Sequence, residues 1–241
     1  MRQDIVICGV GGQGTILASR LIAYAAISAG QGVRTAETIG MAQRGGSVLG
    51  YIRLFDPDDP QAPQAPVVGP AQADLLIAFE PAEAARNLHL LKPGGTLVCS
   101  SHPIKPVQGQ LSKDPAAAYD VDKIIDWLHT CADASGASGA NPAADTAPDA
   151  PAPNLTPSSL APSTLSAPNP AVIQLLVVDT AAICESLGSS KVLNVVLLGA
   201  ALSTKALAIS EAELTSAVQA LVPARMLDLN MQALHAYQLT D

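Results

Sequence analysis

Short apolar runs recur along the chain and predict the strands of a sheet. The first run, residues 4–8, is rich in β-branched side chains and ends at a cluster of glycines, which is typical of a buried strand. Similar runs predict further strands at residues 33–37, 47–54, 75–79, 96–99 and 173–178.

Between these runs the apolar residues repeat at the spacing of a helix. Residues 12–29 predict the first helix, which Gly30 is expected to end, because a glycine adopts the left-handed conformation of a helix C-terminus without strain. A second helix is predicted to begin at Pro81 and to end in the sequence 92–95, Lys-Pro-Gly-Gly. The buried face of the first helix is expected to contain Ala18, Leu21, Ile22 and Ala25.

The chain from Thr180 onward is predicted to be helical. Ser210 and Glu213 have the spacing of a capping box, in which two residues exchange hydrogen bonds at the start of a helix. Pro223 is expected to separate the last two helices, because a proline removes a backbone donor from a helix interior.

Alternating strands and helices indicate an α/β fold. We expect three layers, with a mainly parallel sheet between helices on both faces, a Rossmann-like first βα unit and a helical C-terminal part. The whole chain, 1–241, is predicted to form one domain, which the segment 131–170 interrupts. That segment holds eight prolines, eleven alanines and six serines but no Lys or Arg. It is expected to be a disordered surface insertion, because it has too little apolar surface to bury.

The charge of the chain excludes some classes of partner. The 13 Lys and Arg residues are outnumbered by 21 Asp and Glu, the net charge is −8, and aromatic residues make up 3% of the chain. No nucleic-acid partner is expected, because a phosphate backbone needs clustered basic residues and single strands need aromatic stacking. No apolar run reaches the roughly 18 residues that span a bilayer. With a strand at the start in place of a signal peptide, a cytoplasmic location without membrane contact is expected.

The cysteines and histidines do not predict a metal site. Iron–sulfur clusters and structural zinc need clustered thiolates, and this chain has no CxxC pair and four histidines without spaced partners. No metal ligand and no catalytic residue are predicted from residues this scattered. Two cysteines, Cys8 and Cys99, end apolar runs and are expected to be buried thiols. The full set is Cys8, Cys99, Cys131 and Cys184.

The turn after the first predicted strand has the sequence Gly9-Val-Gly-Gly-Gln-Gly14 and leads into the first helix. Glycines at a helix N-terminus leave backbone N–H groups open to an anion, with no Cβ in the way. The spacing G-x-G-x-x-G, with Glu37 placed 23 residues after Gly14, is also that of a dinucleotide-binding fingerprint. The alternative is that the glycines only permit a tight turn and close packing of the helix on the strand.

A second glycine-rich segment, residues 40–46, contains Arg44 and leads directly into a strand. A dinucleotide-binding domain would instead continue from Glu37 into another crossover helix. An arginine flanked by glycines has its guanidinium free for bidentate contact with a phosphate or a carboxylate, and the alternative is a solvated turn residue. Gln13 is expected either to hydrogen-bond a ligand or to cap the first helix.

Taken together, these motifs resemble the gamma-type domain of the 2-oxoacid:ferredoxin oxidoreductase family. The glycine turn is followed by Arg-Gly-Gly at 44–46 and by Phe-Glu-Pro-Ala-Glu at 79–83, in the order of that family. The wording of residues 37–48 is nearest to the small (beta) subunit of its indolepyruvate branch, and Asn-Val-Val-Leu-Leu-Gly-Ala at 194–200 agrees as well. The resemblance covers nearly all of the chain outside the insertion.

The resemblance implies a subunit of an oxidoreductase for an aryl 2-oxoacid such as indolepyruvate. With coenzyme A and oxidised ferredoxin, such an enzyme gives the aryl acetyl-CoA, CO2 and reduced ferredoxin. It uses thiamine diphosphate, Mg2+ and [4Fe–4S] clusters. This chain lacks clustered cysteines and the acidic diphosphate motif of thiamine enzymes, so these groups are expected on the larger (alpha) partner subunit. The chain is expected to hold no cofactor alone and to be inactive alone.

For this chain the resemblance implies a positioning role near the active site and a share in holding coenzyme A. Glu80 is expected to be a carboxylate at a helix N-terminus rather than a general base. Three alternatives stay open: a related oxidoreductase for pyruvate, 2-oxoglutarate or branched-chain 2-oxoacids, an independent NAD-binding dehydrogenase, and a non-catalytic scaffold. The residues expected to bind coenzyme A are Gly11, Gly12, Gln13, Gly14 and Arg44.

Overall fold

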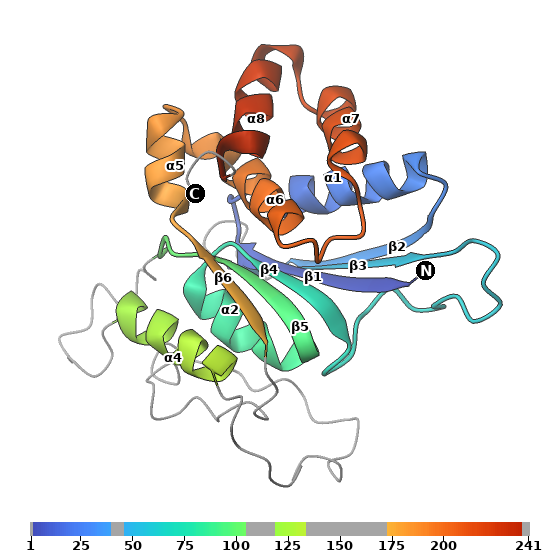
Figure 1. The fold of residues 1–241 in the computed structure, drawn as a ribbon, viewed down its shortest axis with the longest axis horizontal. Helices are drawn as coiled ribbons and strands as arrows, with labels where there is room; N and C mark the ends of the chain where they lie inside the picture. Colours follow the sequence, from blue (N-terminus) through green and yellow to red (C-terminus); the bar gives the residue numbers. More distant parts are fainter. Residues whose placement is uncertain (1, 40–45, 105–118, 134–172, 238–241) are drawn as a thin grey trace, which may run out of the picture.

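A six-stranded sheet lies between two layers of helices in the computed structural model, which describes residues 2–39, 46–104, 119–133 and 173–237 (Figure 1). The strand order is β2-β3-β1-β4-β5-β6, and β3 alone runs against the other strands. The predicted α/β class with a mainly parallel sheet is confirmed. The strands are β1 (Gln3–Val10), β2 (Gly32–Ile39), β3 (Ser47–Phe55), β4 (Ala73–Ala78), β5 (Leu91–Ser100) and β6 (Gln174–Val178).

Helices cover both faces of the sheet, as the sequence predicts. In Figure 1, α1 and α5 to α8 lie on one face, and α2 and α4 lie on the other. No helix in the described part of the chain is long and apolar enough to cross a membrane. The helices are α1 (Thr15–Ser28), α2 (Pro81–Asn87), α4 (Val121–Asp133), α5 (Thr180–Ser186), α6 (Leu193–Ser203), α7 (Glu211–Leu221) and α8 (Ala224–Ala236), with 3-10 turns at Leu88–Leu90 and Ser190–Val192.

The predicted helix ends are present and are closed by hydrogen bonds. At the end of α1 the N–H of Gly30 donates to Ile27 and the N–H of Gln31 donates to Ala26, which satisfies carbonyls that the helix leaves unpaired. At the start of α7 both hydrogen bonds of the predicted capping box, between Ser210 and Glu213, are formed.

The sequence 92–95 was expected to end a helix, and the structure corrects this. Helix α2 ends at Asn87, and β5 begins at Leu91, so these residues belong to the strand. The pairing with β4 passes from Leu91 directly to Thr96, which leaves 92–95 as an irregularity outside the ladder. Lys-Pro-Gly-Gly has the composition of a turn, and here it serves a bulge.

The segment predicted as an insertion begins within a helix. Residues 131–133 are the last residues of α4, where Cys131 and Ala132 pack against the buried cluster under the sheet. Helix α4 therefore extends past the predicted boundary at 131. The rest of the predicted insertion, 134–170, lies outside the described residues, and its disorder stays a prediction.

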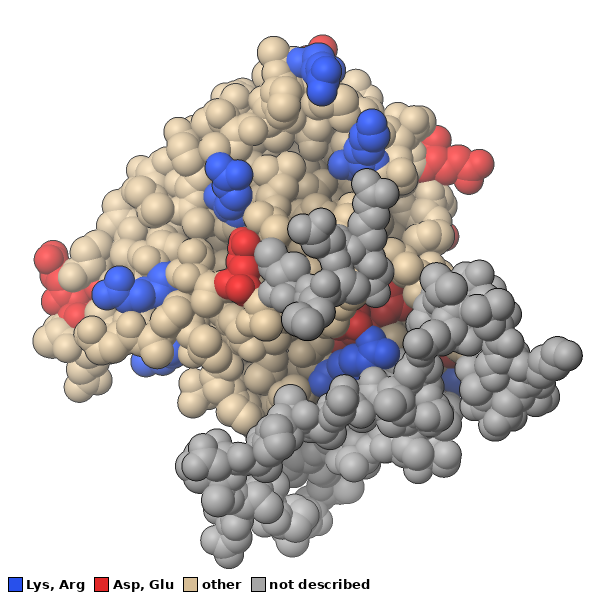
Figure 2. Space-filling view, turned by 180° about the vertical axis from the view of Figure 1, so that it is seen from behind, with Lys and Arg blue, Asp and Glu red and all other residues tan. Residues whose placement is uncertain are grey.

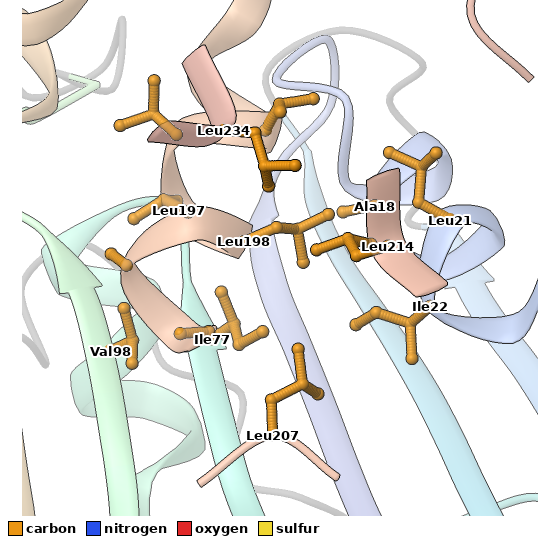
Figure 3. Packing of buried hydrophobic residues seen from close by; sticks show 14 of the residues in the cluster. Ala18, Leu21, Ile22, Ile77, Val98, Leu197, Leu198, Leu207, Leu214 and Leu234 are labelled. Atoms are coloured by element: carbon orange, nitrogen blue, oxygen red, sulfur yellow. The ribbon is translucent and has the colours of Figure 1, made fainter. Parts of the chain in front are cut away.

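The sheet has a hydrophobic cluster on each face. Along β1, Ile5 and Ile7 belong to the cluster under α1 and α6 to α8, while Val6 and Cys8 belong to the cluster under α2 and α4, and all four have 0% exposure. Figure 3 shows the first cluster, where side chains of four helices converge over Ile77 of β4 and the neighbouring strand. The alternation of strand side chains between two buried faces explains why the strands are apolar along their length.

The two longest helices of this layer approach each other most closely at Gly199. A Cβ atom at this position would lie 2.2 Å from the backbone oxygen of Leu234 in α8. A backbone atom cannot move aside as a side-chain tip can, so only glycine permits this crossing of α6 and α8.

We expect Gly199→Ala to lower the free energy of unfolding by about 1–3 kcal/mol, because the added methyl group must push α8 away from α6. Ser203→Ala, at the exposed end of the same helix, is the control and should change it by less than about 0.5 kcal/mol. Urea denaturation of the full chain measures both values. Equal stability of Gly199→Ala and wild type would show that the helices do not depend on this close approach.

Candidate functional site

The glycine turn joins β1 to α1 at the carboxyl end of the parallel strands. Gly14 is the N-cap residue of α1 and has φ of 86°, a left-handed conformation that side chains disfavour. A Cβ atom there would also lie 3.0 Å from Nδ2 of Asn194. Close packing therefore accounts for this glycine, as the structural alternative proposed from the sequence requires, and it brings α6 beside the turn.

Gln13 ties the turn to the end of β4. Its Oε1 accepts from the N–H of Val10 at 2.7 Å, and its Nε2 donates to the carbonyl of Phe79 at 2.8 Å. The sequence suggested a ligand contact or a helix cap, and the structure shows a third role for the amide. Ligand binding by Gln13 stays a prediction.

The first turn of α1 has backbone donors without a protein acceptor. No side chain caps the helix, and no acidic residue lies in its first turn. The first N–H groups of a helix have no partner within it and carry partial positive charge. Within the turn itself, Gly11 donates to the carbonyl of Gly46 at 2.8 Å and the N–H of Gln13 donates to Val10 at 3.2 Å. The donors left for an anion are therefore mainly those at the start of α1.

The segment that follows Arg44 returns to the glycine turn. Arg44 itself lies outside the described residues, so its predicted role stays a prediction. Gly46 accepts the hydrogen bond from Gly11, and Ser47 Oγ donates to Glu83 Oε2 at 2.6 Å. Two motifs about thirty residues apart in the sequence thus meet where β3 begins beside the end of β1.

Two buried carboxylates lie at the start of α2. Glu80 and Glu83 are each 2% exposed. Glu80 Oε2 accepts from the N–H of Glu83 at 2.9 Å, which confirms the expectation of a carboxylate at a helix N-terminus, and its Oε1 accepts from the hydroxyl of Tyr119. Glu83 pairs with Arg86. Burial raises the pKa of Glu80, and its hydrogen bonds with Tyr119 and Glu83 lower it in part.

The predicted buried thiols lie beneath these carboxylates. Cys8 and Cys99 flank Ala78 in one row of the sheet, so they are two strand spacings, about 9.5 Å, apart. Burial, and then the negative charge of Glu83, raises the pKa of Cys8 well above the usual thiol value. Burial and the charge of Glu80 raise the pKa of Cys99. Both thiols are therefore held protonated and are poorly suited to nucleophilic or metal-binding roles.

Histidine residues do not add a metal centre in the part of the chain that the structure describes. No group of three or more His, Cys, Asp or Glu side chains there is arranged to hold a metal ion. His102, which follows β5, is exposed, and its backbone N–H donates to Ser100 Oγ at 3.1 Å. His235 makes a contact of 3.2 Å with Glu211 on the surface.

Basic side chains are mostly committed elsewhere. Arg53, which is 6% exposed, makes a two-pronged ion pair with Asp4 at 2.8 and 2.9 Å. Lys92 pairs with Asp74. On the face shown in Figure 2, the other Lys and Arg side chains lie apart from one another and form no continuous patch among the described residues. Backbone donors are therefore the main positive groups described at the glycine turn.

The sheet order removes the geometric basis of the NAD alternative. In a dinucleotide-binding domain the strand that carries the ribose-binding acid lies beside the first strand. Here the antiparallel β3 separates them, and Glu37 on β2 pairs with Gly50 of β3, which in turn pairs with Ile7 of β1. Glu37 is exposed and lies two strand spacings, about 9.5 Å, from β1.

Sequence comparison places these features in a known family. The family model described as pyruvate ferredoxin/flavodoxin oxidoreductase matches residues 4–237. The indolepyruvate oxidoreductase subunit IorB of Thermococcus kodakarensis is 30% identical over 231 residues, which are 95% of this chain and 91% of that protein. The subunit of the same name from Methanothermobacter thermautotrophicus is 28% identical over 233 residues, which are 97% and 94% of the two chains.

Solved structures share the fold at lower identity. The gamma subunit of a keto/oxoacid ferredoxin oxidoreductase from Geobacter sulfurreducens has a TM-score of 0.58 and 19% identity, and the match covers 97% of this chain and 95% of that chain. A 2-oxoglutarate:ferredoxin oxidoreductase from Magnetococcus marinus, solved with 2-oxoglutarate, coenzyme A and succinyl-CoA bound, has a TM-score of 0.60 and 18% identity. That match covers 99% of this chain and 30% of the longer one.

We expect Glu80→Gln to alter the dependence of stability on pH. Because the pKa of Glu80 is raised in the folded chain, the contribution of its protonated form is complete below the usual glutamate range and is lost as pH rises through the raised pKa. Wild type should therefore lose unfolding free energy relative to Glu80→Gln between about pH 4 and pH 7. Denaturation of both chains across this range measures the difference, and Glu185→Gln, exposed on α5, is the control. A difference that does not change with pH would contradict the expectation.

Proposed function

Because the chain belongs to the pyruvate ferredoxin/flavodoxin oxidoreductase family, we propose that it is the small subunit of a heteromeric 2-oxoacid:ferredoxin oxidoreductase that acts on indolepyruvate and related aryl 2-oxoacids. The observation that carries the proposal is the match over nearly the full length of two chains named indolepyruvate oxidoreductase subunit. The reaction is oxidative decarboxylation of the 2-oxoacid with coenzyme A, which yields an acyl-CoA, CO2 and reduced ferredoxin.

The cofactors are proposed to lie on the larger partner subunit. Thiamine diphosphate with Mg2+ would supply the carbanion chemistry of decarboxylation, and [4Fe–4S] clusters would carry the electrons to ferredoxin. The thiols of this chain do not fit a cluster, because Cys8 and Cys99 are buried on separate strands and the other two cysteines lie on α4 and α5. This chain is therefore proposed to be inactive alone.

The contribution proposed for this chain is to hold coenzyme A through the glycine turn. The support is the set of unpaired N–H groups at the start of α1, next to the exposed Gly12, in a position where no protein carboxylate competes for them. Arg44 is proposed to add the one cationic side chain of this site. Gly11 and Gln13 would act mainly by shaping the turn, because their backbone N–H groups are already paired.

The subunit assignment is tested by co-expression with the large subunit and an anaerobic assay of viologen reduction. We expect activity with indolepyruvate and coenzyme A only when both subunits are present. Pyruvate and 2-oxoglutarate, assayed in parallel, report the substrate class. Full activity of the large subunit alone would overturn the assignment in favour of a scaffold, and turnover of the small chain alone with NAD would revive the dehydrogenase alternative.

The coenzyme A site is tested by Arg44→Ala in the same complex. Loss of one charge-assisted hydrogen bond is worth about 1.5–3 kcal/mol, so the KM for coenzyme A should rise roughly 10-fold or more. The KM for indolepyruvate should stay near its wild-type value. Arg20→Ala, which removes an exposed cation from the middle of α1, is the matched control. An unchanged KM for coenzyme A in Arg44→Ala would contradict the assignment of Arg44.

A further inference from the structure

Asn194 is a buried residue whose side chain is left without a hydrogen bond. It is the second residue of α6 and is 2% exposed. Its Oδ1 has no hydrogen-bond partner among the described residues, where Ser19 Oγ is the other atom in this condition. Buried amides in proteins are almost always paired, because an unpaired one has lost its bonds to water without compensation.

A second buried asparagine shows the usual arrangement. Asn230, on α8, is 4% exposed, and its Nδ2 donates to the carbonyl of Met226 at 2.7 Å. The fold thus offers an internal partner to one asparagine and none to the other. An unpaired amide that lies beside other unpaired donors indicates a group that binds there.

The Asn194 amide lies against the N-terminus of α1. A Cβ atom at Gly14 would be 3.0 Å from Nδ2 and 3.2 Å from Cγ of Asn194. Gly14 is the N-cap of α1, where no side chain accepts from the helix N–H groups. The amide and the unpaired N–H groups of the first turn are therefore neighbours, although they come from opposite ends of the chain. Gly12, on the same turn, is exposed and gives access from solvent.

We propose that Asn194 is a ligand-binding residue, whose side-chain amide joins the first-turn N–H groups of α1 in binding a phosphate group. The inference rests on the proposed role of the turn in holding coenzyme A and adds to it both a residue and the part of the ligand that is bound. A phosphate has several acceptor oxygens at angles that can meet helix N–H groups and a side-chain amide at once. Rotation of the amide by half a turn presents Nδ2 to such a group.

The absence of an acidic residue favours an anion over a cation at this place. The first turn of α1 has no Asp or Glu, and the donors around Gly14 face no carboxylate of the chain. An asparagine adds a donor without adding charge, so the site depends on geometry as well as on the helix dipole. An aspartate of the same shape would repel the same ligand.

The experiment uses the co-purified two-subunit complex and measures binding by calorimetry and the KM for coenzyme A. The probes are coenzyme A, dephospho-coenzyme A, pantetheine and inorganic pyrophosphate, so that the phosphate-bearing and phosphate-free parts of the ligand are compared. We expect Asn194→Ala to weaken coenzyme A binding about tenfold, which corresponds to about 1.4 kcal/mol. The isosteric Asn194→Asp should weaken it further, and pantetheine should bind wild type and both variants equally.

Two matched controls separate binding from folding. Asn230→Ala removes a buried but paired amide, so it should lower the melting temperature and leave coenzyme A binding unchanged. Ser19→Ala removes the other unpaired buried group and should also leave binding unchanged. For Asn194→Ala we expect the reverse of Asn230→Ala, with a melting temperature close to wild type and weaker binding.

Equal affinity of wild type, Asn194→Ala and Asn194→Asp for coenzyme A would overturn the inference. An equal loss for pantetheine and coenzyme A would also overturn it, because the contact would then not be to a phosphate. If wild type binds none of the phosphate-bearing probes, both this inference and the proposed coenzyme A site fail. The assignment as a small subunit, which the two-subunit assay tests, would still stand in that case.

Discussion

The side chain of Gln13 makes two hydrogen bonds that hold together the end of β1, the glycine turn and the end of β4. The turn is short of side chains, so it has few other means of fixing its conformation. Its shape determines where the first N–H groups of α1 point, and where Gly14 meets Asn194 of α6. The same corner receives the start of β3 through Gly46. A single buried amide thus sets the relative positions of four elements, and the candidate site lies where they meet.

The antiparallel strand β3 decides what this corner can bind. It occupies the place beside β1 that a second parallel strand has in a dinucleotide-binding domain, and it moves Glu37 away from the turn. The chain between β2 and β3 therefore enters the site from the side, and Ser47 is held there by Glu83. The first βα unit has the outline of a Rossmann motif, but its surroundings provide an anion site without the acid that reads a ribose.

Local patterns in the sequence predict the elements, and long-range contacts decide the site. Apolar runs, helix spacing and the capping box at Ser210 depend on neighbouring residues, and these predictions are confirmed. The bulge at 92–95 depends on the register between β4 and β5, which no local pattern reveals. The bonds of Gln13 to Phe79 and the contact of Gly14 with Asn194 join residues far apart in the chain. The motif at 194–200 pointed to Asn194 as part of the family pattern, but its unpaired amide is visible only in the fold.

The two unpaired buried groups of the described chain have different meanings. Ser19 lies on α1 against β3, where a Cβ atom at Gly50 would be 2.8 Å from its Oγ. A hydroxyl in a helix can rotate toward the carbonyl one turn earlier, so its isolation is corrected by a small movement and needs no ligand. Asn194 has a planar amide wedged against a helix N-terminus, and the nearest unpaired groups there are donors that need an acceptor too. Only an added acceptor can satisfy the helix N–H groups and the amide Nδ2 together, which is why Asn194, and not Ser19, indicates a bound anion.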